Sequence, residues 1–285
     1  MSQAGSPTRI EVIHTTEFHY DRDISETIME LRLQPRNDAT QRCLDFRLAV
    51  DPPGHLTSFP DSHGNVVHHF NYRPRHRRIQ IVARSVVETG LADSTIDSND
   101  SVTWRYQFRT FDGPVQELPE VLALADQLRP VRLDDATEVE RALVDLTTLI
   151  HQRFQYQPGV TNVQSTVTDM LRLGAGVCQD FTHFWIAVCR AMTIPARYVS
   201  GDLHEPVDAG DYEATHAWPE AWIPGKGWSG FDPTNPIRAT PRHVKVAVGR
   251  DYRDVAPTKG VFLGPASEQI RVQVQTRLLE GATAS

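Results

Sequence analysis

The cysteine at position 178 is placed where a nucleophile could act. Cys178 lies in the stretch GVCQDFTHFWIAVCRAM (residues 176–192), where Gly176 precedes it and a long apolar run follows. A cysteine attacks as its thiolate, and a helix N-terminus favours negative charge because its first N–H groups are unpaired. The stretch therefore favours a nucleophile at the start of a helix, although a small buried cysteine is the commoner situation. Cys189, deep in the apolar run, is predicted to be a core residue.

A nucleophilic cysteine needs a base, and the base is usually held by a carboxylate or an amide. His216 in THAWPEAW and Asp232 in GWSGFDPTN follow Cys178 in that order along the chain. A histidine among tryptophans is often only structural. A histidine and an aspartate on neighbouring predicted strands, after a cysteine that opens a helix, favour a catalytic triad instead.

The hairpin between these two segments decides whether His216 and Asp232 share a face of the sheet. Directly opposed residues of an antiparallel pair lie on the same face. A two-residue turn would place Asp232 on the face away from His216, whereas a three-residue turn over residues 224–226 places it opposite Trp218, on the His216 face. The triad therefore requires an odd-length turn or a bulge here.

The rest of the chain predicts an α+β fold with two parts. Alternating apolar residues predict strands around residues 10–20, 29–33, 44–50, 79–83 and 102–108, with turn signals between them, and this pattern is typical of an antiparallel β-sandwich. After Gly113 and Pro114 the apolar period becomes helical. We therefore expect an N-terminal β-sandwich domain over residues 1–115 and a catalytic domain over residues 116–285.

The second part is expected to hold three helices and further strands. Thr137 with Glu140 suggests a capping box for a first helix, and residues 166–173, closed by Gly174, suggest a second. The segment that begins near Cys178 is the third helix. Strands are expected around residues 196–203, 215–223 and 228–232, and a last one around residues 270–276.

Composition and charge restrict the partners. The chain has 29 basic and 36 acidic residues, a net charge of −7, which argues against a nucleic-acid or anionic-membrane partner. Three cysteines are too few for a disulfide framework, so free thiols are expected. No signal-like segment or long apolar run is present, so a cytoplasmic location is predicted. His63, His68 and His69 are expected to be solvated loop residues, and the oligomeric state is open.

Three sequence blocks carry a resemblance to a known family. GAGVCQDFTHFWIAVCRAMTIPARYVSGDL, THAWPEAWIPGKGW and GFDPTNP resemble the core of the transglutaminase-like superfamily, and LRLQPR and DSHGNVV more loosely resemble the β domain that precedes the core in its bacterial members. The resemblance implies a papain-like core in which a helix with the catalytic cysteine packs on an antiparallel sheet. It also implies that Cys178 is the nucleophile, His216 the general base and acid, and Asp232 its orienting partner.

The same resemblance leaves the oxyanion hole open. The superfamily often supplies one donor from an aromatic or amide side chain upstream of the cysteine, but this chain has no tryptophan between Trp104 and Cys178. Tyr156 and Gln179 are weak candidates for that donor. Asp180 and His183 could pair with each other or line the site.

The predicted function is cleavage of a peptide or isopeptide amide through a thioester on the cysteine. Acyl transfer to an amine is the first alternative, and a catalytically idle interaction module is the second. A metal site made by Cys178, His183 and His216 has no CxxC or HExxH spacing to support it, so no metal or other cofactor is expected. The expected partner is a peptide or protein that carries the amide.

Overall fold

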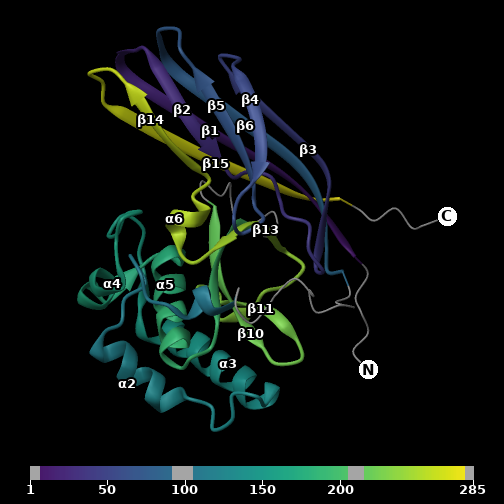
Figure 1. Cartoon of the computed structure of the whole chain (residues 1–285), viewed down its shortest axis with the longest axis vertical. Helices are drawn as coiled ribbons and strands as arrows, with labels where there is room; N and C mark the ends of the chain where they lie inside the picture. The colour runs from purple at the N-terminus through teal and green to yellow at the C-terminus, as the bar shows by residue number, and fades with distance from the viewer. Residues whose placement is uncertain (1–6, 92–104, 205–214, 280–285) are drawn as a thin grey trace, which may run out of the picture.

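The computed structural model describes residues 7–91, 105–204 and 215–279. A β-sandwich forms one end of the molecule, and helices cover one face of a further sheet at the other end (Figure 1). The predicted α+β class, with an antiparallel sandwich followed by a mixed core, is confirmed.

The sandwich consists of two antiparallel sheets. In spatial order, the first sheet contains β15 (Glu268–Leu279), β1 (Thr8–Ile24), β6 (His76–Thr89) and β3 (Gln41–Asp51). The second contains β14 (Thr258–Leu263), β2 (Glu26–Leu31), β5 (Val66–Tyr72) and β4 (His55–Pro60). Alternate residues of β1 and β6, such as Phe18, Tyr20, Ile79 and Ile81, point into the space between the sheets and are buried.

A third antiparallel sheet carries the core. In spatial order it contains β12 (Ile237–Arg238), β11 (Gly227–Asp232), β10 (His216–Ile223), β9 (Ala196–Leu203) and β13 (His243–Gly249). The helices are η1 (Gln107–Arg109), α2 (Pro119–Leu128), α3 (Ala136–Arg153), α4 (Val167–Leu173), α5 (Cys178–Ala191) and α6 (Tyr252–Val255). Two short strands, β7 (Gln155–Tyr156) and β8 (Ala175–Gly176), pair in parallel.

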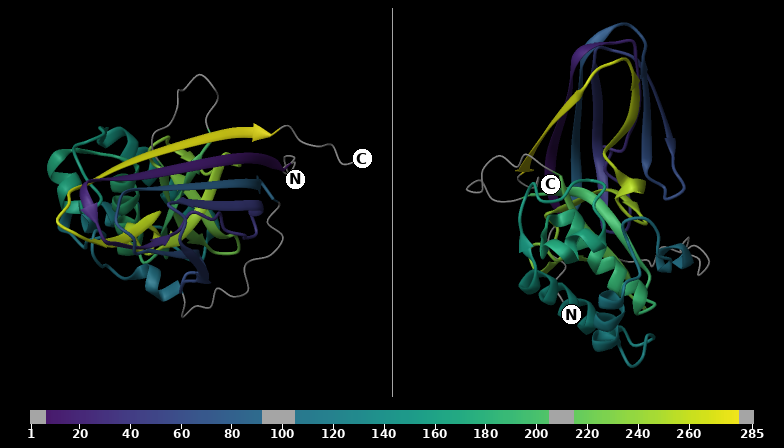
Figure 2. Two further views of the ribbon diagram at one scale, coloured as in Figure 1. Left: turned by 90° about the horizontal axis from the view of Figure 1, so that it is seen from above. Right: turned by 90° about the vertical axis from the view of Figure 1, so that its left-hand side faces the viewer.

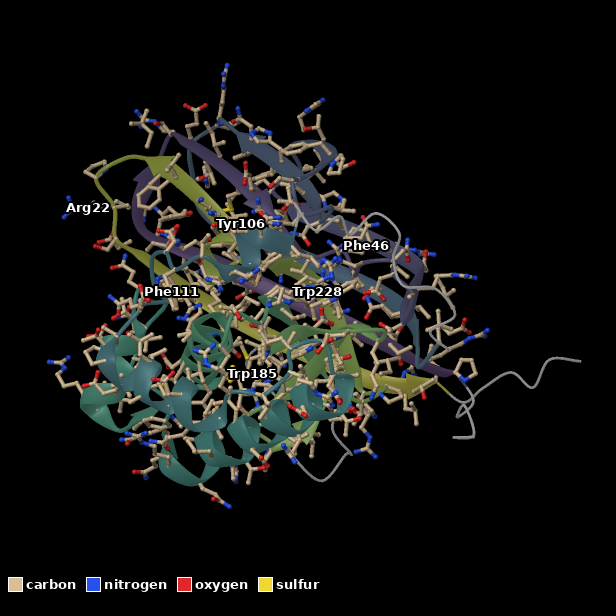
Figure 3. All side chains as sticks on the ribbon, turned by 60° about the horizontal axis from the view of Figure 1, so that its bottom comes forward. Arg22, Phe46, Tyr106, Phe111, Trp185 and Trp228 are labelled. Carbon is tan, nitrogen blue, oxygen red and sulfur yellow. The ribbon has the colours of Figure 1, made fainter. Side chains whose placement is uncertain are left out.

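Helix α5 is the centre of the core. Every residue of the helix after Cys178 is buried, because α2, α3 and α4 pack around it while β9 and β10 lie against its remaining side. Trp185 lies within this helical layer (Figure 3), and its indole N–H donates to Thr147 Oγ1 at 2.9 Å. Cys189 is fully buried, as predicted. Within the described residues no helix, α5 included, is long and apolar enough to cross a membrane.

The helix starts show which capping signals were correct. Thr166 and Asp169 form the reciprocal capping box of α4, and Gly174 ends that helix at a positive φ of 65°. The expected capping box of Thr137 and Glu140 is wrong. Helix α3 starts two residues earlier than that box would place it, because Asp135 is the N-cap and accepts from the backbone N–H groups of Thr137 and Glu138.

The strand expected over residues 102–108 is also wrong where it can be compared. Its first part, up to Trp104, lies outside the described residues. The remainder forms a helical turn that ends in η1, and Phe108 is buried there. The carbonyl oxygens of Phe108 and Thr110 accept from the buried Arg190 guanidinium of α5, so this turn is held by the core instead of by a sheet.

The C-terminal strands do not follow the expected division at residue 115. β14 pairs with β2, and β15 pairs with β1 over its whole length (Figure 2, left). The chain therefore leaves the sandwich after β6, builds the core, and returns to complete both sheets of the sandwich. An apolar alternation predicts a strand but not its partner, because both sheets need an apolar face.

Two amide side chains of the sandwich cover the outer edge of the core sheet. Asn65 bonds to both the N–H and the C=O of Val248 at 2.8 Å, and Gln41 bonds to both groups of Lys245 at 2.8 and 2.7 Å. Both partners lie on the edge strand β13, whose unpaired backbone groups would otherwise be buried without a partner. The DSHGN turn is therefore a docking element, and the expectation that His63 is solvated is wrong, since it is buried with Nε2 3.2 Å from Asp254.

We predict that Asn65→Ala lowers the free energy of unfolding by about 2–4 kcal/mol, because it leaves two buried backbone groups of Val248 unpaired. Urea unfolding followed by tryptophan fluorescence measures the change. Asn37→Ala is the matched control, since Asn37 caps one backbone N–H at an exposed position. Equal effects of the two substitutions would contradict the role assigned to Asn65.

Candidate active site

Cys178 is the first residue of α5, and Asp180 fixes that start. The Asp180 carboxylate accepts from the backbone N–H of Val177 at 2.8 Å and from Thr161 Oγ1 at 2.6 Å. A Cβ on Gly176 would lie 2.8 Å from this carboxylate, so glycine is needed there. Burial raises the pKa of Asp180, and these hydrogen bonds, which lower it, offset only part of that effect. Asp180 therefore holds the helix start and does not pair with His183.

The β10–β11 hairpin has the odd-length turn that is needed to place His216 and Asp232 on one face of the sheet. Ile223 pairs with Gly227, which leaves a three-residue turn over residues 224–226, and the prediction is confirmed. Continuing this register places Asp232 opposite Trp218. His216 Nε2 lies 2.8 Å from Asp232 Oδ2, so the two side chains meet on one face of the sheet.

Asp232 is fully buried and accepts hydrogen bonds on both oxygens. Its Oδ2 accepts from His216, from His243 Nε2 at 3.2 Å and from Asn235 Nδ2 at 2.9 Å. Its Oδ1 accepts from the backbone N–H groups of Thr234 and Asn235 at 2.9 and 3.2 Å. The carboxylate is thus a shared acceptor that fixes the turn after β11 as well as the imidazole.

The electrostatics of the pair favour two charged partners. Burial lowers the pKa of His216, but hydrogen bonds to Asp232 and Cys178 and the charges of both groups outweigh burial and raise the pKa to about 10. Burial raises the pKa of Asp232, but the hydrogen bonds from both histidines and from Asn235 hold it far below its ordinary value. At neutral pH the pair is therefore a carboxylate and an imidazolium. Because Nε2 serves Asp232, Nδ1 is the ring nitrogen left for the Cys178 sulfur.

The His216–Asp232–His243 cluster has the residue types of a metal site, but one of its ligand nitrogens carries a proton. One ligand atom of each residue lies within 4.8 Å of the others. However, the Thr240 backbone N–H donates to His243 Nδ1 at 3.0 Å, so in the neutral ring the proton is on Nε2 and points at Asp232. A metal would need that nitrogen deprotonated. The cluster fits a hydrogen-bonded carboxylate better than a metal centre.

Tyr156 and Gln179 lie beside the start of α5. β7 pairs with β8 so that Tyr156 is opposite Gly176, and the half-exposed Tyr156 ring contacts Phe181 edge-on. Burial raises the pKa of Tyr156, and the charges of Cys178 and Asp232 raise it further, as expected for a neighbour of the site. The Gln179 side chain is turned toward the Asn162 carbonyl oxygen, 3.3 Å away.

His183 is not brought into the site. It is buried one turn further along α5, against Tyr198, and its Nε2 accepts from the Tyr252 backbone N–H at 3.2 Å. Burial lowers its pKa to about 3, so the ring is neutral. The hypothesis that His183 lines the site therefore gains no support, and its position indicates that it holds α6 against the helix.

Sequence reasoning missed His243 and Asn235, both of which bind the Asp232 carboxylate. Asn235 lies in the DPTN segment, where the Asp-x-x-Asn spacing could have suggested a turn closed on its own aspartate. His243 opens the strand HVKVAVG, whose alternating valines are a strand signal, but nothing local in that segment indicates its partner.

Two family models match most of the described chain. Residues 10–88 match the bacterial transglutaminase-like N-terminal region, and residues 125–233 match the transglutaminase-like superfamily. An uncharacterized protein of Mycobacterium leprae is 33% identical over 289 residues, with 95% of this chain and 99% of the relative covered. A protein-glutamine gamma-glutamyltransferase of Pseudomonas aeruginosa is 30% identical over 152 residues, which are 50% of this chain but 21% of the relative.

A solved structure shows the same fold throughout. A protein from Cytophaga hutchinsonii, described as a candidate cysteine protease, superposes with a TM-score of 0.78 at 24% sequence identity, covering 98% of this chain and 93% of that one. The sandwich and the core therefore occur together in this arrangement in another protein.

We predict that Asp232→Asn lowers the titration midpoint of His216 by about 1–3 pH units, because the opposing charge that offsets burial is lost. In the wild type the ring should remain protonated until the pH approaches about 10. Imidazole ¹⁵N spectra recorded across the pH range measure both midpoints, with Asp45→Asn, an exposed carboxylate on β3, as the control. An unchanged midpoint in Asp232→Asn would contradict the ion pair.

Proposed function

The chain belongs to the transglutaminase-like superfamily, and we propose that it is a cysteine enzyme that cleaves a peptide or isopeptide amide through a thioester. The observation that carries the proposal is the contact of His216 with both Cys178, at the start of α5, and the buried carboxylate of Asp232. An imidazolium and a helix N-terminus both favour a thiolate.

The proposed reaction has two steps. The Cys178 thiolate attacks the amide carbonyl carbon, and His216 gives its proton to the leaving amine as the C–N bond breaks. The acyl group remains on sulfur as a thioester. His216, now neutral, removes a proton from water as the water attacks the thioester, and the thiolate and the imidazolium are restored while the carboxylic acid leaves.

The negative oxygen of each tetrahedral intermediate needs donors. The first N–H groups of α5 have no acceptor within the helix, so the Cys178 backbone N–H is placed to be one. The Tyr156 hydroxyl is the proposed second donor, because Tyr156 lies beside the helix start and its raised pKa keeps the phenol protonated. Gln179 is a weaker candidate, since its side chain already bonds to the Asn162 carbonyl.

Acyl transfer to an amine is the second candidate function. The gamma-glutamyltransferase named among the relatives favours it, although that relative shares only half of this chain. The same three residues serve either outcome, because the thioester reacts with whichever nucleophile reaches it. A catalytically idle interaction module is disfavoured by the intact Cys178, His216 and Asp232 set.

We predict fast alkylation of Cys178 alone when the protein is incubated with a low concentration of iodoacetamide between pH 5 and 9. Labelling should persist below pH 7 and slow markedly in His216→Ala, because the imidazolium no longer supports the thiolate. Intact mass and peptide mapping measure the rate and the site. Slow labelling that is spread over Cys43, Cys178 and Cys189, and that rises only near the free-thiol pKa of about 8.5, would indicate an unactivated thiol and favour the interaction module.

We predict that Cys178→Ser lowers turnover of a peptide amide by at least about a thousandfold, the scale of loss when a triad nucleophile is removed. Mass spectrometry of the products, with and without a primary amine, separates hydrolysis from transfer: a carboxylate product supports hydrolysis, and an amine adduct supports transfer. Cys43→Ser, a partly exposed cysteine of the sandwich, is the matched control and should retain full activity. Full activity of Cys178→Ser would exclude the proposed nucleophile.

A further inference from the structure

We propose that His243 is a positioning residue of this site, which binds the Asp232 carboxylate together with His216 and keeps it directed at the His216 ring. The inference rests on the proposed function for its catalytic meaning. It concerns a residue on β13, the strand that the sandwich holds at its edge, and not a member of the triad.

The hydrogen bonds fix which nitrogen of His243 faces the carboxylate. The Thr240 backbone N–H donates to His243 Nδ1, and the His243 backbone N–H donates back to the Thr240 carbonyl oxygen at 2.9 Å. This closed turn leaves Nε2 to carry the proton of the neutral ring, and that N–H donates to Asp232 Oδ2 at 3.2 Å. A backbone donor on Nδ1 thus selects the tautomer that serves Asp232.

The packing fixes the rings as well. Trp218 contacts His243 edge-on at 5.0 Å between ring centroids and stacks on His216 at 6.0 Å, while the two imidazoles are 6.1 Å apart. Both Trp218 and His243 are almost fully buried. They also line a cavity of about 260 Å³ between the core sheet and the sandwich. The two histidines therefore bind one carboxylate and also contact the same tryptophan ring.

The turn that carries Thr240 and His243 is held by the sandwich. Thr89, at the end of β6, donates its hydroxyl to the Pro241 carbonyl oxygen. A Cβ on Gly90 would lie 3.1 Å from the Pro241 ring, so the sandwich backbone approaches this proline closely. The sandwich therefore supports Asp232 through a chain of two contacts, from Thr89 to Pro241 and from His243 to the carboxylate.

Several titratable groups act on the pair and must be considered with His243. Cys178 faces His216 from α5, Tyr156 on β7 interacts with the charges of Cys178 and Asp232, and the buried Asp202 on β9 interacts with the His216 charge. Burial raises the pKa of Asp202 to about 7, and His216 opposes that shift. None of these groups donates a hydrogen bond to Asp232. Removing the His243 N–H therefore changes the Asp232 carboxylate in a way that these groups do not. A carboxylate with one donor fewer holds the proton shared with His216 more tightly.

The test is the His216 titration in His243→Phe, which keeps the ring volume but removes the N–H. The midpoint of His216 should rise by about half a pH unit or more and return toward the wild-type value in His243→Gln, whose side-chain amide can donate from a similar place. Turnover should fall roughly tenfold in His243→Phe with little change in KM, because a more tightly held proton makes a poorer general acid. His76→Phe, a buried histidine of the sandwich that bonds Thr27, is the matched control and should change neither.

Unchanged His216 midpoints in both His243 variants would overturn the proposal and leave His243 as a core residue. If His243→Phe does not fold, His243→Gln and the wild-type ¹⁵N spectrum decide the matter: a wild-type ring protonated on Nδ1 and not on Nε2 would equally overturn it. Alkylation of Cys178 in the wild type tests the proposed function separately. If Cys178 is not labelled but the His216 midpoint shifts in His243→Phe, the proposed enzyme is rejected and the role of His243 is kept. If Cys178 is labelled but the His216 midpoint does not shift, only the role of His243 is rejected.

Discussion

The structure around the site depends on one buried charge, the Asp232 carboxylate. A carboxylate without solvent exposure is unstable unless donors replace its water, and five hydrogen bonds do so here. Three come from the turn that follows β11, and the other two come from histidines on β10 and β13. Each donor lies on an element that other contacts hold in place. Asp232 therefore keeps its five hydrogen bonds only when all of these elements are in position together. The His216 ring is directed at Cys178 as one consequence of that requirement.

The same requirement links the sandwich to the candidate site, although the sandwich contributes none of Cys178, His216 and Asp232. β13 is the edge of the core sheet, and its outer backbone groups are paired by the side chains of Gln41 and Asn65. Lys245, also on β13, lies 2.7 Å from Asp38 of the sandwich and 2.6 Å from Glu220 of β10, in a buried ion cluster. Loss of these contacts would free the strand that carries His243. The sandwich thus supports Asp232 indirectly, because it holds the strand that carries His243.

Features of the site and the fold that depend on neighbouring residues could be predicted from the sequence, whereas contacts between distant segments of the chain could not. The start of α5 and the register of the β10–β11 hairpin were predictable, because an apolar run after glycines and the length of a turn are local features. His243 was not, since its partner is eleven residues away across an unpredicted strand. The return of β15 to β1 was missed for the same reason: alternation indicates a strand, whereas pairing depends on the whole topology. At the start of α3 the N-cap is Asp135 and not the predicted Thr137, because the Asp135 carboxylate accepts from two backbone N–H groups.

The topology also argues against an independently folding catalytic domain. A fragment that begins at residue 116 would carry β14 and β15 without β2 and β1, the strands with which they pair. It would also expose Val244, which packs against Ile10, Val12 and Val87 of the sandwich, and it would leave the edge of β13 unpaired. Since β13 holds His243 and so contacts Asp232, the exposed edge lies one hydrogen bond from the proposed catalytic pair. The N-terminal strands are therefore part of what makes the geometry of the candidate site stable, and they act on that site through β13.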